Sequence, residues 1–180
     1  RSIVFLSWNE VEIIYNELIN QERYQEATLL ALGVDSAGRK NELHQVLKDS
    51  ITEDGNFTNE VVGKRAKKFK LMYHDMTKEA YALYMKQRGE DDIPSLWITT
   101  RGERKQLDAD GLYDMVVSWR KILEDKTGEY KEFNVHSLRH IALELLSTGE
   151  HYIAKKLGKK FDLDSLKLLA HHESIETTSG

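Results

Sequence analysis

The sequence predicts a mostly α-helical domain with a small antiparallel β-sheet, which is an α+β fold. Three observations lead to this prediction. Apolar residues recur at helical spacing through most of the chain, this spacing fades between Ile51 and Tyr73, and a single proline among 180 residues leaves few interruptions. A chain of this length fits one domain with a substantial core, so we interpret residues 1–180 as continuous.

Three helices are expected before residue 50. Ser7 and Glu10 match a capping box at the start of the first, whose apolar residues follow the i, i+3, i+4, i+7 spacing of a buried face. These apolar residues are Val11, Ile14, Tyr15, Leu18 and Ile19. The second helix is expected over 23–32 and ends in a short turn over 33–35, and the third opens near Ser36. The buried side of the third would carry Leu43, Val46 and Leu47.

The segment 51–73 is expected to form the small sheet. Short apolar pieces around Ile51, at 57–62 and at 69–73 are separated by turn-like sequences. These sequences are Glu53-Asp54-Gly55-Asn56 and Gly63-Lys64-Arg65.

Helical spacing resumes after the sheet. One helix is expected over 77–88 and another over 108–125, and two or three more follow from Val135 to the end. The helix over 108–125 has a wide apolar stripe, which we assign to the core rather than to a cofactor site. The stripe consists of Leu112, Met115, Val116, Trp119, Ile122 and Leu123.

The composition excludes several classes of protein. Hydrophobic residues make up 40% and charged residues 31% of the chain, which excludes collagen-like, low-complexity and wholly disordered proteins. The absence of cysteine excludes disulfides, thiolate metal sites and cysteine nucleophiles, and suits a reducing compartment. No apolar run reaches the ~20 residues that span a bilayer, and residues 1–6 lack a signal-peptide stretch. We therefore expect a globular cytoplasmic protein without a membrane partner.

The charges are unevenly distributed along the chain. The formal net charge of −4 argues by itself against a nucleic-acid partner, because phosphates favour a basic surface. Residues 61–70, however, contain five basic residues and no acidic one, and residues 155–160 form a second basic cluster. Such a run is ordinarily a solvated loop. As the alternative, Arg65, Lys67 and Lys68 are candidate DNA contacts.

The segment 135–140, Val-His-Ser-Leu-Arg-His, carries the strongest signal for chemistry. A helix here would bury its apolar residues and place His136, Arg139 and His140 together on the opposite face. A histidine beside a fixed cation suits the binding of a phosphate or another anion better than general-base catalysis of acyl transfer. The alternative is a surface helix with a few polar residues.

A metal site is a further alternative for this helix. His136, His140 and Glu144 recur at i, i+4 and i+8, a spacing that can present metal ligands along one helix. Arg139 lies in the middle of that face and opposes a cation. We therefore prefer the anion-binding interpretation and expect no metal.

Three other patterns are weak on their own. Arg39 and Glu42 stand three apart and would form an ordinary surface ion pair on a helix. Residues 63–67 read as a basic hairpin tip. Residues 168–178, Leu-Leu-Ala-His-His-Glu-Ser-Ile-Glu-Thr-Thr, contain His171 and His172, and a buried histidine there is more often a satisfied core residue.

Taken together, the order and spacing of these patterns resemble the tyrosine recombinases, the phage-integrase family. Arg39 and Glu42 match the family's arginine helix of the T-G-L-R-x-x-E-L type, and Lys64 matches the lysine of a V-x-G-K hairpin. The H-x-L-R-H motif is matched without gaps by His136, Arg139 and His140. The resemblance spans nearly the whole chain and implies the family's catalytic-domain fold.

The terminal family motif, L-L-G-H-x-S-I-x-T-T, is matched by residues 168–178 with one extra residue before His172. The glycine of this motif is absent here, so His171 and His172 are both candidates for the motif's histidine. We favour His172, because it keeps the family spacing to Ser174. Two further departures are Arg65 in place of the commoner second glycine of G-K-G and an apparent insertion over 151–161. Neither removes a catalytic residue.

The resemblance implies site-specific recombination or integration of DNA, as in phages and mobile elements, without metal, ATP or another cofactor. A tyrosine attacks the scissile phosphate, a 3′-phosphotyrosyl link forms and a 5′-hydroxyl leaves. Two arginines would hold the non-bridging oxygens, the lysine would protonate the leaving oxygen, and the histidines would assist. The implied catalytic residues are Arg39, Lys64, His136, Arg139 and His172, supported by Glu42, His140 and His171.

The nucleophile is expected outside the sequence. The family places its tyrosine shortly after the terminal histidine, in a run H-x-S-I-x-T-T-x-x-Y, which puts it immediately after Gly180. All eight tyrosines precede this motif, and Tyr152 comes nearest. Because the sequence starts with Arg1, we also expect it to be a catalytic domain cut from a longer chain with an N-terminal DNA-binding region. As it stands, the fragment is expected to be inactive.

The resemblance implies double-stranded recombination sites as partners, with other protomers in a tetramer on DNA. Two alternatives of different classes remain open. One is a catalytically inactive DNA-binding module of the same fold, and the other is a metal-dependent hydrolase that uses His136, His140 and Glu144.

Overall fold

The structure, a computed structural model of the chain, describes residues 3–162. In chain order the elements are α1 (Trp8–Asn20), α2 (Tyr24–Ser36), α3 (Lys40–His44), the 3-10 turn η1 (Lys48–Ser50), β1 (Phe57–Val62), the 3-10 turn η2 (Lys64–Ala66), β2 (Lys68–Met72), α4 (Asp75–Arg88), α5 (Ala109–Thr127), α6 (Ser137–Thr148) and α7 (Tyr152–Leu157). The prediction of a mostly helical fold with a small antiparallel sheet is confirmed.

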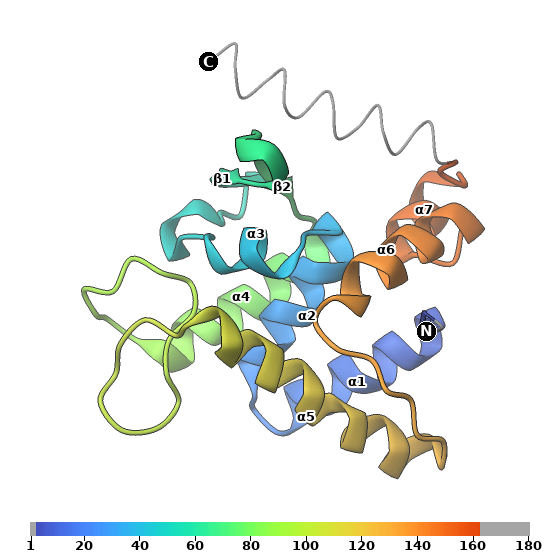
Figure 1. Cartoon of the computed structure of the whole chain (residues 1–180), viewed down its shortest axis with the longest axis horizontal. Helices are drawn as coiled ribbons and strands as arrows, with labels where there is room; N and C mark the ends of the chain where they lie inside the picture. The colour runs from blue at the N-terminus through green and yellow to red at the C-terminus, as the bar shows by residue number, and fades with distance from the viewer. Residues whose placement is uncertain (1–2, 163–180) are drawn as a thin grey trace.

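Helix α2 lies at the centre of the domain. Residues 27–35 are buried without interruption, and the helix packs against α1, α3, α4, α5 and α6. Figure 1 shows the β1–β2 hairpin at one end of the molecule and α1 and α5 at the other, with α2 between them. A helix that is apolar nearly all round is expected to be buried on every side, as α2 is.

The beginning of α1 follows the predicted capping box. Ser7 Oγ accepts a hydrogen bond from the Glu10 N–H at 3.1 Å, and Glu10 Oε1 accepts one from the Ser7 N–H at 2.9 Å. The five apolar residues of the predicted buried face behave as expected, except that Ile19 is only partly buried. The predicted helices over 77–88 and 108–125 are also present, and the apolar stripe of the latter lies in the core as predicted, with Met115 partly buried.

The turn predicted over residues 33–35 is wrong, because α2 continues to Ser36. Tertiary contacts sustain the extra turn. An ideal Cβ on Gly33 would lie 3.0 Å from Leu138 Cδ1, so glycine lets α6 pack closely there. The helix ends at Ser36: Ala37 follows in the left-handed region with a φ of 55°, and its N–H donates to the Gly33 carbonyl at 2.9 Å.

The predicted third helix is shorter than expected, and its buried side was partly misassigned. Leu43 and Val46 are buried, but Leu47 lies beyond the end of α3 with 42% of its surface exposed. The apolar piece around Ile51 is no strand; its side chain packs in the core from an irregular segment. The periodicity of short segments does not distinguish a strand from a loop residue that fills the core.

The sheet consists of β1 and β2 in antiparallel register, with a one-residue irregularity between Phe57 and Glu60. At this bulge the Thr58 hydroxyl accepts the Leu71 N–H at 3.0 Å and donates to the Asn59 carbonyl at 2.8 Å. The Thr58 side chain thereby replaces a ladder bond. A bulge re-aims side chains, and Asn59 lies within this irregularity.

A buried polar cluster joins the last turn of α2 to α4 and α7. The Asp35 carboxylate accepts hydrogen bonds from the His74 N–H at 2.9 Å, the Thr77 hydroxyl at 2.7 Å and the Tyr152 hydroxyl at 2.7 Å. Burial raises the pKa of Asp35, and these three donors oppose that shift. Next to it, His151 bonds the Val34 carbonyl through Nε2 at 2.9 Å.

Tyr152 is therefore committed to the core. Its hydroxyl donates to Asp35 and accepts the Met76 N–H at 3.1 Å, and its ring stacks on Trp8. Burial and the neighbouring carboxylate raise its pKa above the ordinary value for tyrosine, which makes the phenolate harder to form. The segment 151–161, interpreted from sequence as an insertion, contributes helix α7 to this cluster.

Among residues 3–162, no helix is both long and apolar enough to cross a bilayer.

The Asp35 cluster gives a stability prediction. Tyr152→Phe removes one donor from a buried carboxylate and one acceptor from Met76, so the free energy of unfolding should fall by about 1–3 kcal/mol in urea titrations. Tyr130→Phe is the matched control, because Tyr130 is 54% exposed. Equal unfolding midpoints for the two variants would contradict the role assigned to the cluster.

Candidate functional site

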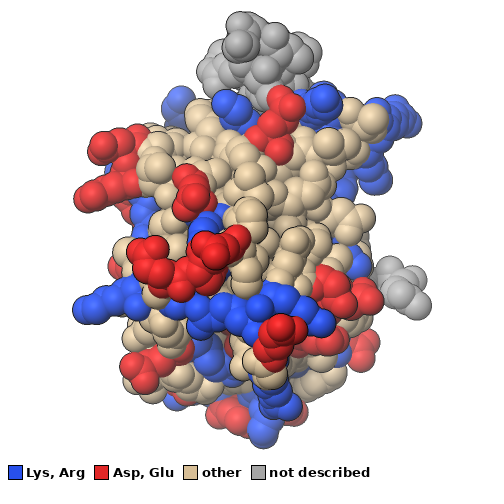
Figure 2. Space-filling view, turned by 90° about the vertical axis from the view of Figure 1, so that its left-hand side faces the viewer, with Lys and Arg blue, Asp and Glu red and all other residues tan. Residues whose placement is uncertain are grey.

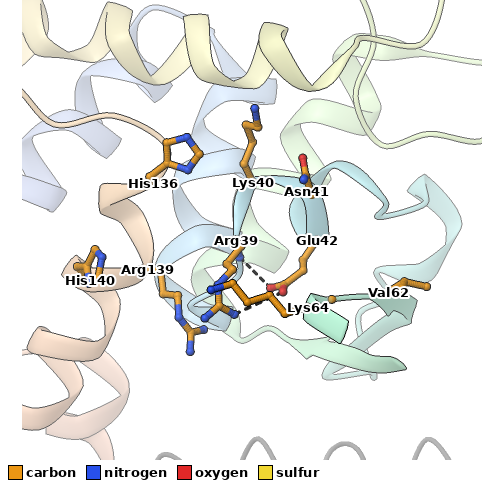
Figure 3. Close-up of a pocket in the computed structure, with 10 residues that line it drawn as sticks. Arg39, Lys40, Asn41, Glu42, Val62, Lys64, His136, Arg139 and His140 are labelled. Atoms are coloured by element: carbon orange, nitrogen blue, oxygen red, sulfur yellow. Dashed lines mark hydrogen bonds and ion pairs between the residues drawn. The ribbon is translucent and has the colours of Figure 1, made fainter. Parts of the chain in front are cut away.

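The site is an open pocket of about 480 Å³ between the start of α3, the β1–β2 hairpin and the start of α6. The described residues that line it are Arg39, Lys40, Asn41, Glu42, Val62, Gly63, Lys64, His136, Arg139 and His140. The pocket thus brings together every candidate site residue of the resemblance that lies in the described part of the chain (Figure 3). His171 and His172 lie outside that part.

Arg39 and Glu42 form the floor of the pocket at the beginning of α3. Glu42 is 3% exposed, and its Oε1 accepts the Arg39 N–H at 2.9 Å, which satisfies a free donor at the helix start. Its other oxygen, Oε2, lies 3.6 Å from the Arg39 guanidinium, whose side chain is 40% exposed. The buried carboxylate therefore holds both the backbone and the side chain of an arginine that remains accessible.

Arg139 approaches from α6 and is held by the end of α2. Its Nη1 donates to the Ala37 carbonyl at 2.8 Å. Partial burial lowers the pKa of Arg139, and the nearby positive charge of Arg39 lowers it further, while Glu42 opposes both effects. Two like-charged guanidiniums held near each other favour an anion between them, because the anion relieves their repulsion.

The hairpin brings Lys64 into the pocket from a third direction. Figure 3 shows its side chain pointing from the hairpin toward the two arginines. At Gly63, directly after β1, the backbone passes close to Glu42. An ideal Cβ on Gly63 would lie 2.9 Å from Glu42 Oε2 and 2.6 Å from the Phe69 ring. Glycine is required here by space, not by its backbone angles.

The hairpin tip is exposed and strained. Arg65 and Ala66 both have positive φ, 60° and 57°, a region that disfavours residues other than glycine. The candidate DNA contacts Arg65, Lys67 and Lys68 are all exposed. Figure 2 shows several Lys and Arg side chains at the end of the molecule where the hairpin lies, with acidic side chains among them, and basic and acidic side chains are intermingled lower on this face as well.

The histidines line the α6 side of the pocket. His136 directly precedes α6 and is exposed, and its ring lies 6.1 Å from that of Tyr113. The Asn134 side chain accepts the His136 N–H at 2.8 Å and so fixes the backbone of this turn. In Figure 3, His140 lies on the side of Arg139 away from Lys64, which places it at the edge of the pocket.

The charge of the pocket fits an anion. Among the described residues that line it, Glu42 is the single acid, against two arginines and two lysines. In residues 3–162 no group of three or more His, Asp or Glu side chains is arranged to hold a metal ion. The alternative that used His136, His140 and Glu144 as ligands therefore has no converging donor set to support it.

Three further lining residues were not predicted from the sequence: Lys40, Asn41 and Val62. Lys40 Nζ lies 3.8 Å from a carboxylate oxygen of Asp110 at the beginning of α5. No sequence pattern predicts this ion pair, because the two residues are 70 positions apart. The one available signal was adjacency, because each of the three lining residues lies within two positions of Arg39 or Lys64.

The fold is that of the tyrosine recombinase catalytic domain. The structure superposes on that of XerA recombinase with a TM-score of 0.68 at 15% identity, covering 96% of this chain and 65% of that chain. For XerH site-specific recombinase bound to its difH substrate, the TM-score is 0.60 at 18% identity, with 94% of this chain and 53% of that chain covered. For the lambda integrase catalytic core, it is 0.58 at 16% identity, with 85% and 89% covered.

These similarities confirm, at the level of the fold, the resemblance drawn from the sequence motifs. The chain spans about half to two thirds of the XerH and XerA chains. No protein-family model and no curated protein sequence matches it.

Proposed function

We propose that this chain is the catalytic domain of a site-specific recombinase that cuts and rejoins DNA through a 3′-phosphotyrosyl intermediate. The observation that carries the proposal is the convergence of Arg39, Lys64 and Arg139, from three separate segments, on one pocket with a single paired acid. The fold similarity to recombinases supports it. Phosphoryl transfer depends mainly on positioning and charge stabilisation, which such a pocket can supply.

In this mechanism Arg39 and Arg139 bind the two non-bridging oxygens of the scissile phosphate. A guanidinium can make two parallel hydrogen bonds to such oxygens and stays charged throughout. Lys64 gives its proton to the 5′-oxygen as the bond to phosphorus breaks. His136 takes up or orients the proton of the attacking hydroxyl, with His172 as a further hydrogen-bond donor to the phosphate.

The supporting residues act through these groups. Glu42 orients Arg39, and His140, which lines the pocket, supports His136. His171 keeps the supporting role that the resemblance implies. The hairpin residues Arg65, Lys67 and Lys68 contact the DNA backbone. The printed descriptions of similar structures include XerH bound to difH substrate and a lambda integrase tetramer bound to a Holliday junction. By analogy, we propose double-stranded DNA and other copies of the protein as partners.

The nucleophile is proposed to be a tyrosine encoded directly after Gly180. A suicide substrate that traps the covalent intermediate tests this proposal. The longer protein with that tyrosine should become covalently attached to DNA. Residues 1–180 should not, because they would have the arginines and the general acid but no nucleophile to attack the phosphate. Covalent capture by residues 1–180 alone, or another codon at that position, would overturn the nucleophile assignment, and the second result would favour an inactive DNA-binding module.

DNA affinity should depend steeply on salt. Each phosphate contact by lysine or arginine releases condensed counterions, so log K should fall linearly with log[salt]. Fluorescence anisotropy with a duplex across a salt series measures the slope, and replacing Lys67 and Lys68 with Ala should make it shallower. A flat dependence would count against DNA as the partner, despite the net charge of −4.

Arg139→Lys should separate cleavage from binding. Lysine keeps the charge but cannot make the bidentate contact, so the full-length protein should fold and bind DNA while cleavage falls on the order of 10²–10³-fold. Circular dichroism and duplex affinity serve as controls for folding and binding. Normal cleavage by this variant would show that Arg139 does not clamp the phosphate.

Lys64→Ala should suppress cleavage of an ordinary phosphodiester in the full-length protein, because the leaving oxygen then lacks its proton donor. A 5′-bridging phosphorothiolate has a leaving group that needs no proton, and it should restore much of the rate. The comparison of the two substrates is the measurement. Equal loss on both substrates would remove Lys64 as the general acid.

A further inference from the structure

The outer edge of β1 is covered in an unusual way. Gln45, directly after α3, places its side-chain amide against the backbone of Val62: Oε1 accepts the Val62 N–H at 2.8 Å, and Nε2 donates to the Val62 carbonyl at 2.9 Å. The same Nε2 donates to the Asn41 carbonyl at 2.8 Å. One side chain therefore satisfies both groups of a strand residue, as a neighbouring strand would.

Asn59 makes the reciprocal contact at the bulge. Its Nδ2 donates to the Gln45 carbonyl at 3.1 Å, and its Oδ1 accepts the Leu47 N–H at 2.8 Å. Residues 45–47 and β1 are thus joined by two side-chain amides, which we call the amide clamp. Both residues are partly buried, but of these bonds only the one from Asn59 Nδ2 to the Gln45 carbonyl is itself partly buried, and the others lie at the surface.

The position of the clamp links it to the pocket. Gln45 lies three residues after Glu42 on the segment that carries Arg39, and Val62 lies two residues before Lys64. Gly63, which lies between Val62 and Lys64 in the chain, packs directly against Glu42. At the tip, the Lys64 side chain is exposed, and its hairpin has strained backbone angles at Arg65 and Ala66. The base of the hairpin is therefore the part that can fix where Lys64 lies.

We infer that Gln45 and Asn59 are positioning residues that hold the Lys64 hairpin in register with the Arg39 helix. Neither residue lines the pocket. They act by keeping the distance between the proposed proton donor and the proposed phosphate clamp constant, and displacement by about 1 Å can cost on the order of 10²-fold in rate. This inference rests on the proposed function.

The first test needs no activity. In residues 1–180, hydrogen exchange of the Val62 amide, measured by NMR, should become roughly tenfold faster or more in Gln45→Leu, because its acceptor is removed while the side-chain size is nearly kept. Gln87→Leu is the matched control, since Gln87 also donates to a backbone carbonyl, that of Glu22 at 2.8 Å, but far along the chain on α4. Unchanged exchange at Val62 in Gln45→Leu would refute the clamp itself.

The second test uses the full-length protein with both cleavage substrates. Gln45→Leu and Asn59→Ala should each slow cleavage of the phosphodiester about 10- to 100-fold and cleave the 5′-bridging phosphorothiolate at close to the rate of the parent, as a misplaced proton donor predicts. Gln87→Leu should behave as the parent on both. Equal loss on both substrates would overturn the positioning role, because a general loss of folding or DNA binding does not distinguish leaving groups.

Lys64→Ala is measured in parallel, so that the proposed proton-donor role of Lys64 and the positioning role of Gln45 and Asn59 are tested separately. If the phosphorothiolate rescues Lys64→Ala but not Gln45→Leu, the inference fails and the proposed function stands. If it rescues neither, the proposed role of Lys64 fails, and the inference fails with it. Rescue of both, together with faster exchange at Val62, is the outcome that supports the inference.

Discussion

The carbonyl groups at the end of helix α2 are the constraint on which the rest of the structure depends. The last carbonyls of a helix have no partner within it, and in a buried helix they must find donors from other segments. His151 donates to the carbonyl of Val34, and Arg139 donates to that of Ala37. Both donors lie more than 100 residues away along the chain. Satisfying one helix end therefore fixes α6 and α7 against the centre of the domain.

This constraint also sets the geometry of the pocket. Arg39 follows Ala37 by two residues, so the group that binds Arg139 lies beside the helix that presents Arg39. The two guanidiniums lie near enough to repel each other: partial burial lowers the pKa of Arg139, and the positive charge of Arg39 lowers it further. An anion bound between the two guanidiniums would relieve their repulsion. Because both side chains are already held in place, its binding would also need little reorganisation of the protein.

Sequence periodicity was sufficient for most helices and for the sheet, because their faces are buried in a regular pattern. It failed where tertiary contacts override local preference. Residues 33–35 look like a turn, but burial against α6 and the bonds to Asp35 keep them helical. That Arg39, Lys64 and Arg139 would share one pocket was predictable, because their spacing resembles family motifs. The contact between Gln45 and Asn59 was not, since nothing local indicates that two amides 14 residues apart meet at a bulge.

The pocket combines rigid and adjustable parts. Arg39 and Arg139 are anchored by a buried carboxylate and a helix-end carbonyl, so they present positive charge from held positions. Lys64 lies on an exposed hairpin, whose Gly63 packs against the buried Glu42. Charge stabilisation requires groups that do not move during the reaction, whereas a proton donor must reach an oxygen that departs. Under the proposed function, a hairpin held at its base and exposed at its tip would meet the second requirement without disturbing the first.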